Sequence, residues 1–185
     1  MPRDVTITKL RRNSKRYTTA FVLAALSLAG GINIGCTNID CPLDNVVVAT
    51  CGLYAAEDHS SLTLSDTLSV IAGGEKDTIL LNRAQDIQTF QLPLRQGATV
   101  DTLLFRLSNT TQAATDTIFL EHTNTAHFES VDCPAAVFHN IVSARWTSHA
   151  LSQMPMTIDS VAVTRPLVNY DDIENIKIFL RSTSL

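Results

Sequence analysis

Residues 101–108 and 116–122 read DTLLFRLS and DTIFLEH, and these two segments decide the fold class. In the first segment every second residue, Leu103, Phe105 and Leu107, lies on one face of an extended chain. Ile118 and Leu120 share a face of the second segment in the same way. A period of two, with many Thr, Val and Ile residues, indicates half-buried β-strands. The two segments therefore predict an all-β domain.

The same pattern continues over most of the chain from Asp44 onward. It predicts nine short strands, at residues 46–54, 67–72, 78–82, 87–94, 102–108, 117–122, 128–132, 157–164 and 175–180. Turns are predicted at 72–75, 96–97 and 170–172, and segment 135–152 fits a long loop, one more strand or a short helix. We expect an antiparallel β-sandwich of about eight or nine strands, Ig-like or jelly-roll-like, with a barrel as the alternative.

The N-terminal part has the layout of a secretory signal peptide. Four basic residues within 11–16 precede the apolar run TTAFVLAALSLAGGINIG, and Cys36 follows it directly. This run is marginal as a permanent membrane span, which needs about 20 apolar residues. Gly35 before Cys36 resembles a bacterial lipobox, in which the cysteine is diacylated and becomes the new N-terminus. Asn33 departs from that pattern, because an aliphatic residue is usual there.

We therefore predict a signal peptide over residues 1–35, a lipid on Cys36, a tether over 36–44 and a single β domain over 45–185. A diacyl group with an amide-linked chain attaches a protein stably to a membrane, since each buried methylene contributes about 0.8 kcal/mol. Thr37, not Asp, follows Cys36, which favours the outer membrane, with the exported domain facing the periplasm or the cell surface. The alternatives are an uncleaved N-terminal anchor, or cleavage after Ala29 to give a soluble periplasmic protein.

The 185 residues have a formal net charge of −4, which hides an uneven distribution. Residues 1–35 carry six Lys/Arg and one acid, whereas residues 36–185 carry eight Lys/Arg and seventeen Asp/Glu, a net charge of −9. An acidic domain repels phosphate backbones, and no basic cluster interrupts it. We therefore expect no nucleic-acid partner.

Three cysteines remain after Cys36, namely Cys41, Cys51 and Cys133. In an oxidising compartment an odd number indicates one disulfide and one free thiol, or an intermolecular bond. The pair Cys41–Cys133 would fasten the tether to the distal half of the domain, while Cys51 lies in a predicted strand where a small buried thiol fits. Cys51–Cys133, or no disulfide, are the alternatives. The spacing matches no zinc site.

Asp-Ser/Thr-aliphatic triplets recur along the chain and include five of its thirteen Asp residues. On a structural interpretation the triplet marks the boundary between a turn and a strand: Asp bonds the local backbone at the end of the turn, and Thr begins a pleated strand. The triplet also resembles the O-glycan acceptor motif of exported Bacteroidetes proteins. On that second interpretation, the acceptor hydroxyls would be those of Thr67, Thr78, Thr102, Thr117 and Ser160.

Short motifs along the mature chain resemble a family of small uncharacterised Bacteroidetes envelope lipoproteins, a domain of unknown function. Beside the lipobox-like cysteine, these motifs are Ile39-Asp40-Cys41-Pro42, Leu92-Pro93-Leu94, Val131-Asp132-Cys133, Ile158-Asp159-Ser160-Val161 and Asn175-Ile176-Lys177-Ile178. The resemblance implies an exported β-rich lipoprotein and also favours pairing Cys41 with Cys133. It implies no activity.

No nucleophile elbow, zinc-protease motif, nucleotide-binding loop or EF-hand spacing occurs, so no catalytic residue, cofactor or metal ligand is predicted. His122 and His127 are interpreted as surface residues, and Trp146 as a core or rim anchor. We expect a non-enzymatic, lipid-anchored binding or accessory module whose partner is an envelope protein or a glycan. The alternatives are an envelope hydrolase acting on polysaccharide or peptide, and a spacer without a ligand. An enzyme should show converging Asp, Glu and His side chains in a concave pocket.

Intact mass measurement of the protein from the membrane fraction tests the predicted leader. We expect a chain that begins at Cys36 and carries an added mass of lipid size, because the lipidated cysteine becomes the N-terminus. A chain that begins at Met1 or Gly30, without such an added mass, would contradict the prediction.

Overall fold

The computed structural model describes Cys41 and residues 46–183. Ten strands form two sheets in this part of the chain, and neither an α-helix nor a 3-10 helix occurs in it. Among the described residues no helix is long and apolar enough to span a membrane. The predicted signal peptide 1–35, Cys36 and most of the tether lie outside the described residues.

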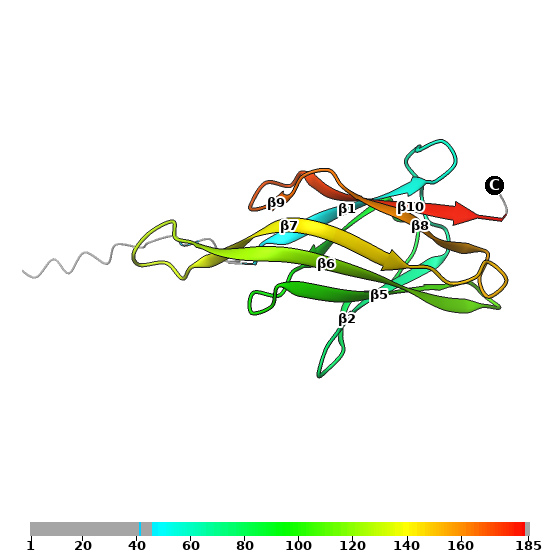
Figure 1. Cartoon of the computed structure of the whole chain (residues 1–185), viewed down its shortest axis with the longest axis horizontal. Helices are drawn as coiled ribbons and strands as arrows, with labels where there is room; N and C mark the ends of the chain where they lie inside the picture. Colours follow the sequence, from blue (N-terminus) through cyan, green and yellow to red (C-terminus); the bar gives the residue numbers. More distant parts are fainter. Residues whose placement is uncertain (1–40, 42–45, 184–185) are drawn as a thin grey trace, which may run out of the picture. The chain divides into compact units, whose positions relative to one another are not determined.

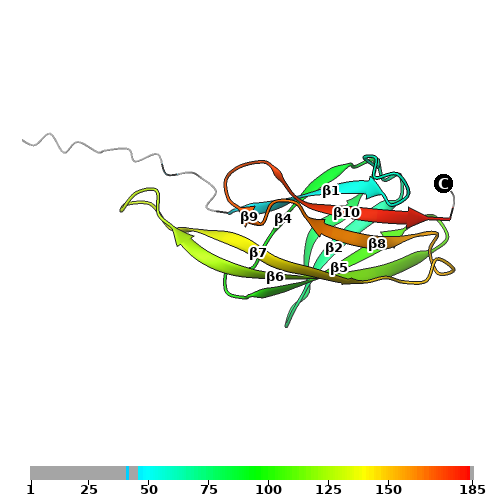
Figure 2. The same ribbon diagram turned by 45° about the horizontal axis from the view of Figure 1, so that its top comes forward.

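Sheet I has four strands and sheet II has six. The order in sheet I is β4 (Thr89–Pro93), β1 (Val48–Ala55), β10 (Glu174–Ser182) and β8 (Met156–Val163). The order in sheet II is β3 (Thr78–Ala84), β2 (Thr67–Gly73), β5 (Val100–Ser108), β6 (Ala113–His127), β7 (Ala136–Thr147) and β9 (Leu167–Val168). Sheet II curls like half of a barrel, and the two sheets form an all-β sandwich-like fold (Figures 1 and 2).

Alternation along the strands places the core between the sheets. Leu53 and Ile178 of sheet I and Leu103, Ile118 and Leu120 of sheet II are each 1 % exposed. Fully burying one such side chain contributes about 1.5–3 kcal/mol to folding. The segments that indicated the fold in the sequence thus supply the centre of its core.

Several details differ from the sequence prediction. The first and last strands, β1 and β10, pair in parallel, so the sandwich is not purely antiparallel. Residues 128–132 are not a strand: they belong to the β6–β7 turn, because β6 pairs with β7 as far as His127 and Ala136. Segment 135–152 contains one more strand, β7. Ile79, in the predicted strand 78–82, is 61 % exposed on the edge strand β3 and is not part of the core.

A buried carboxylate connects the two sheets. Asp116 of β6, which is 0 % exposed, accepts hydrogen bonds from the backbone N–H groups of His149 (2.6 Å) and Ile158 (2.8 Å). It also contacts the Nδ1 atom of His149 at 2.7 Å and accepts a bond of 3.0 Å from the hydroxyl of Thr157. Ile158 and Thr157 belong to β8 of sheet I. Asp116 therefore holds β8 and the preceding loop against sheet II.

The contacts of the His149 ring show how this group is arranged. His149 presents Nδ1 to the Asp116 carboxylate and Nε2 to the carbonyl oxygen of Met154 at 3.3 Å. The Thr157 hydroxyl lies on the same side of the ring, 3.4 Å from Nδ1. A Ser-His-Asp-type triad needs nucleophile and carboxylate on opposite ring nitrogens, so this group is not one.

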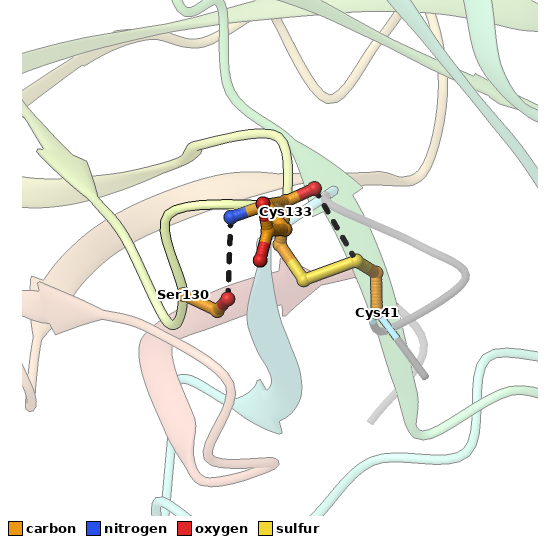
Figure 3. Close-up of a disulfide and its surroundings, with 4 residues drawn as sticks. Cys41, Ser130 and Cys133 are labelled. Carbon is orange, nitrogen blue, oxygen red and sulfur yellow. Dashed lines mark hydrogen bonds between the residues drawn. A yellow bond between two sulfur atoms is a disulfide. The ribbon is translucent and has the colours of Figure 1, made fainter. Parts of the chain in front are cut away.

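A disulfide joins Cys41 to Cys133 in the β6–β7 turn, 92 positions later, with a Cα–Cα distance of 5.5 Å (Figure 3). The turn is further held by bonds from the Cys133 N–H to the Ser130 carbonyl (3.3 Å) and from the Asp132 N–H to the Ser130 hydroxyl (3.2 Å). Cys51 is a buried free thiol on β1. Burial, and to a lesser extent the charge of Glu174, raise the pKa of Cys51 to about 12, which keeps the thiol protonated and unreactive.

Replacing Asp116 tests the connection between the sheets. Asp116→Asn should lower the free energy of unfolding by about 3 kcal/mol, because the new amide NH2 group faces donors that bond the buried carboxylate, and each buried donor left without an acceptor costs about 1–3 kcal/mol. Urea denaturation followed by circular dichroism measures the change. Asp159→Asn is the matched control: the Asp159–Arg181 pair is 35 % and 51 % exposed, so its loss should cost no more than about 1 kcal/mol. Equal effects of the two variants would contradict the role of Asp116.

Candidate functional site

The main surface hollow lies on the face of sheet II that points away from the core. Ser69 of β2 and Arg106 of β5 are cross-strand partners on this face, and their strand neighbours Val70 and Phe105 point inward and are buried. A hollow of about 510 Å³ opens here, and a second of about 340 Å³ shares five of its lining residues. The two form one groove, which we call the arginine groove.

Polar groups dominate the lining of the arginine groove. Two guanidinium groups, of Arg83 and Arg106, are accompanied by the hydroxyls and amides of Ser65, Thr67, Ser69, Asn82, Gln85, Ser108, Asn109, Thr110, Thr111 and Gln112. Ile71, Ile79 and Ala113 add an apolar part, and Asp66 is the carboxylate at one end. The Asn109 side chain accepts bonds from the Thr111 and Gln112 N–H groups, at 2.9 and 2.8 Å, and so orders the turn that closes the groove.

A β-bulge positions Arg83. In the pairing of β2 with β3, Leu68 lies opposite Ala84 and Val70 opposite Leu81, so that two residues of β3 face Ser69 alone. Arg83 adopts a left-handed backbone conformation with φ 49°, and its N–H donates a 3.1 Å bond to the Ser69 hydroxyl. Bulges re-aim side chains, and residues held in uncommon backbone conformations concentrate at functional sites. The bulge places the Arg83 side chain in the groove beside Arg106.

Neither guanidinium is neutralised within the described part of the chain. The ion pairs there involve Arg95, Arg165, Arg181 and Lys177 and two histidines, but neither Arg83 nor Arg106. No described hydrogen bond uses either guanidinium group. A guanidinium binds carboxylate, sulfate or phosphate oxygens in a bidentate manner. The groove thus presents two free cationic forks among hydroxyls and amides, on a domain that is otherwise acidic.

The described lining of the groove has few groups that can transfer protons. No Glu or His lines it among the described residues, and Asp66 is its single carboxylate. General acid–base catalysis requires two groups of suitable pKa converging on the substrate. The arrangement is therefore suited to binding an anionic, hydroxyl-rich ligand.

A second polar group lies inside the domain, where Asp101 is 2 % exposed, His122 1 % and His139 2 %. The Asn124 amide nitrogen donates to the carbonyls of Gln96 (2.8 Å) and Ala98 (2.7 Å), so its oxygen is the acceptor for both histidines. The Nδ1 atoms of His122 and His139 lie 2.8 and 2.7 Å from that oxygen.

Asp101 completes this group by binding both His122 and the preceding loop. One oxygen lies 3.1 Å from His122 Nε2 and accepts a bond of 3.0 Å from the Arg95 N–H, and the other contacts Arg95 Nε at 2.5 Å. Burial and, to a lesser extent, the neighbouring His122 lower the pKa of His139. These contacts fix loop 94–99 on the strands β5, β6 and β7.

The interpretation of His122 as a surface residue is therefore wrong. A register shift between Glu121 and His122 turns its ring inward, where Asp101 and Asn124 replace its hydration. In the sequence, the Asp-Thr-Leu triplet at Asp101 is the one signal of this buried contact. The triplet does not show which histidine binds the aspartate. Trp146, interpreted as a core or rim anchor, is 36 % exposed at the rim and donates a 2.9 Å bond to the Asp159 carbonyl.

The five hydroxyls of the predicted O-glycan acceptors are spread over five strands and do not form one site. Thr78 is exposed, whereas Thr102, Thr117 and Ser160 are half-buried. Thr67 is only 7 % exposed, and its hydroxyl accepts a 2.9 Å bond from Gln85 in the wall of the arginine groove. Glycosylation of these residues stays a prediction. In the described residues no three His, Cys, Asp or Glu side chains lie close enough to hold a metal ion.

The lowered pKa of His139 predicts a pH effect on stability. Because the folded chain binds this proton less readily than the unfolded chain, the native state loses stability as the pH falls below about 6.5. His139→Gln can keep a donor to Asn124 but cannot titrate, so it should lose less stability than the wild type between about pH 7.5 and about pH 5.5. Urea midpoints at the two pH values measure the difference, and identical slopes would contradict the prediction.

Comparison with known proteins places the domain in a family but gives it no activity. No curated protein and no solved structure matches the chain. A family model described as "Family of unknown function (DUF6452)" matches residues 67–180, from the start of β2 to near the end of β10. The match covers more than half of the chain and includes both buried Asp–His groups and all lining residues of the arginine groove except Ser65 and Asp66. The chain belongs to the DUF6452 family, whose function is unknown.

Proposed function

We propose that this protein is a non-enzymatic, lipid-anchored envelope protein that binds an acidic glycan in the arginine groove. The observation that carries the proposal is the pair of unneutralised guanidinium groups, Arg83 and Arg106, in a groove of hydroxyls and amides. Carboxylate or sulfate groups of the glycan would take the two forks, and its hydroxyls would bond the neutral polar side chains. The elongated shape, from two adjoining hollows, suits several sugar units.

The proposed location comes from the leader and from the resemblance to Bacteroidetes lipoproteins. Export through a signal peptide over 1–35 and acylation of Cys36 would place the domain on the outer membrane, facing the periplasm or the cell surface. The disulfide between Cys41 and Cys133 suits such an oxidising compartment. An acidic glycan is a polymer available in that location, and the cationic groove would attract it over a distance of about 10 Å.

An envelope hydrolase is the second candidate, and one observation favours it. A hollow of about 420 Å³ is lined by Asp101 and Glu75 together with Lys76 and Arg95, so two carboxylates face one space. Asp101, however, is 2 % exposed and already accepts bonds from Arg95 and shares one with His122. A carboxylate engaged in this way is poorly placed to exchange protons with a substrate. Binding in the arginine groove is the stronger proposal.

Binding of a polyuronate to the purified full-length protein tests the proposal, with uncharged dextran as the comparison ligand. Arg83→Gln and Arg106→Gln should each weaken binding about tenfold or more, since a hydrogen bond to a charged group contributes about 1.5–3 kcal/mol. Calorimetry at low and high salt measures the affinity, which salt should reduce.

Arg145→Gln is the matched control, because Arg145 lies on the same sheet but outside the groove, over the ring of Phe119. Equal loss in all three variants, or equal binding of dextran, would contradict the proposed site. Release of new reducing ends from the polyuronate would instead support the hydrolase.

A further inference from the structure

The disulfide brings the chain just after the proposed lipid to one end of the domain. Cys41 is bonded to Cys133 in the β6–β7 turn, and its sulfur lies 4.0 Å from the Asp132 carbonyl oxygen (Figure 3). The β6–β7 hairpin extends beyond the last β5–β6 pair, Val100 with Glu121, and its turn projects at one end of the sandwich (Figure 2). The start of β1 and strand β9 lie toward the same end (Figures 1 and 2).

Exposed apolar side chains gather at this end, which we call the tethered end. Of the ten large hydrophobic residues that are exposed in the described part of the chain, six belong to the β6–β7 turn, the residues before β1, β9 and the β9–β10 loop: Val46 (56 %), Phe128 (68 %), Val131 (99 %), Leu167 (43 %), Tyr170 (42 %) and Ile173 (53 %). Large exposed apolar side chains that cluster in this way mark a site at which a membrane, a ligand or another protein binds.

Ring contacts and a shared hollow join parts of the tethered end. His127 stacks on Phe138 with ring centroids 4.2 Å apart, and Tyr170 packs edge-on against Phe138 at 5.2 Å. Val46 and Tyr170 line the same hollow. The β6–β7 hairpin, the β9–β10 loop and the start of the domain are therefore linked by side-chain contacts or a shared hollow, and their exposed side chains lie around these links.

The length of chain between the lipid and the disulfide limits how far this end can be from the membrane. Cys36 precedes Cys41 by five residues, which span at most about 18 Å when fully extended. This reach is less than half of the thickness of a bilayer with its headgroup layers, which is about 40–45 Å. A lipid on Cys36 would therefore keep Cys133 within reach of the headgroups. Among the described residues, no second disulfide ties the opposite end of the sandwich to the chain that follows Cys36.

We propose that the tethered end lies on the bilayer that receives the Cys36 lipid, with Phe128 and Val131 inserted among the headgroups. This inference rests on the lipid anchor of the proposed function. Glu129 and Asp132 flank the two apolar side chains, so the contact favours zwitterionic over anionic lipids. The domain is then held in one orientation on the membrane, in addition to being attached to it.

Fluorescence of tryptophan placed at the turn tests the contact in the full-length lipidated protein. Phe128→Trp, made in a Trp146→Phe background, is reconstituted in phosphatidylcholine vesicles that carry bromine on the acyl chains near the headgroups. Ile79→Trp in the same background is the matched control, because Ile79 is also 61 % exposed but lies on the edge strand β3. We expect strong quenching at position 128, little at position 79, and weaker quenching at 128 when phosphatidylglycerol is added.

The outcomes separate this inference from the anchor itself. A chain with a lipid-sized added mass but no quenching at position 128 would overturn the membrane contact and leave the anchor in place. A chain without that added mass would overturn both. A blue shift at position 128 that grows with protein density but is insensitive to bromine would show a second copy of the chain as the occupant, against the proposal. Phe128→Trp with Trp146 retained, where an additional quenched component is expected, gives an independent reading should the background variant unfold.

Discussion

The buried carboxylate of Asp116 is the constraint on which the relation of the two sheets depends. Apolar side chains between two sheets favour burial but tolerate sliding, because dispersion contacts have little direction. Asp116 adds direction: it accepts bonds from Thr157, Ile158 and His149, so β8 has one position along β6. Within sheet I, β8 pairs with β10 and β10 pairs with β1, so the position of β8 is connected to the rest of that sheet. Directional bonds from one side chain thus fix the alignment of the two layers.

Much of the fold was accessible from the sequence, because alternation depends only on which residues avoid water. It located strands around Leu103, Ile118 and Ile178 and gave the all-β class correctly. The prediction was wrong where a polar side chain turns inward, at His122. Burial of a polar residue requires partners from distant strands, and nothing within a local window of sequence shows them. The parallel pairing of β1 with β10 could not be predicted for the same reason, because the two strands lie far apart in the sequence.

The arginine groove could not be predicted because it matches no motif. Arg83 and Arg106 belong to strands β3 and β5, which are not neighbours, and they meet through β2 lying between them. The β-bulge that orients Arg83 changes the register between β2 and β3. No glycine or proline at the bulge indicates this change in the sequence. The net charge of the sequence indicates an acidic domain, but it does not show that the fold brings two of the few cationic side chains into one hollow.

The Cys41–Cys133 disulfide also decides how the domain bears mechanical load. A pull on the chain from its N-terminal side reaches Cys41 and passes through the covalent bridge into the β6–β7 turn, by-passing the beginning of β1. Without the bridge, the same force would act on β1, which lies between β4 and β10 in the four-stranded sheet. With it, the force acts on two long paired strands, β6 and β7, inside the six-stranded sheet. The bridge thus directs tension away from one strand of the smaller sheet and into the longest hairpin of the fold.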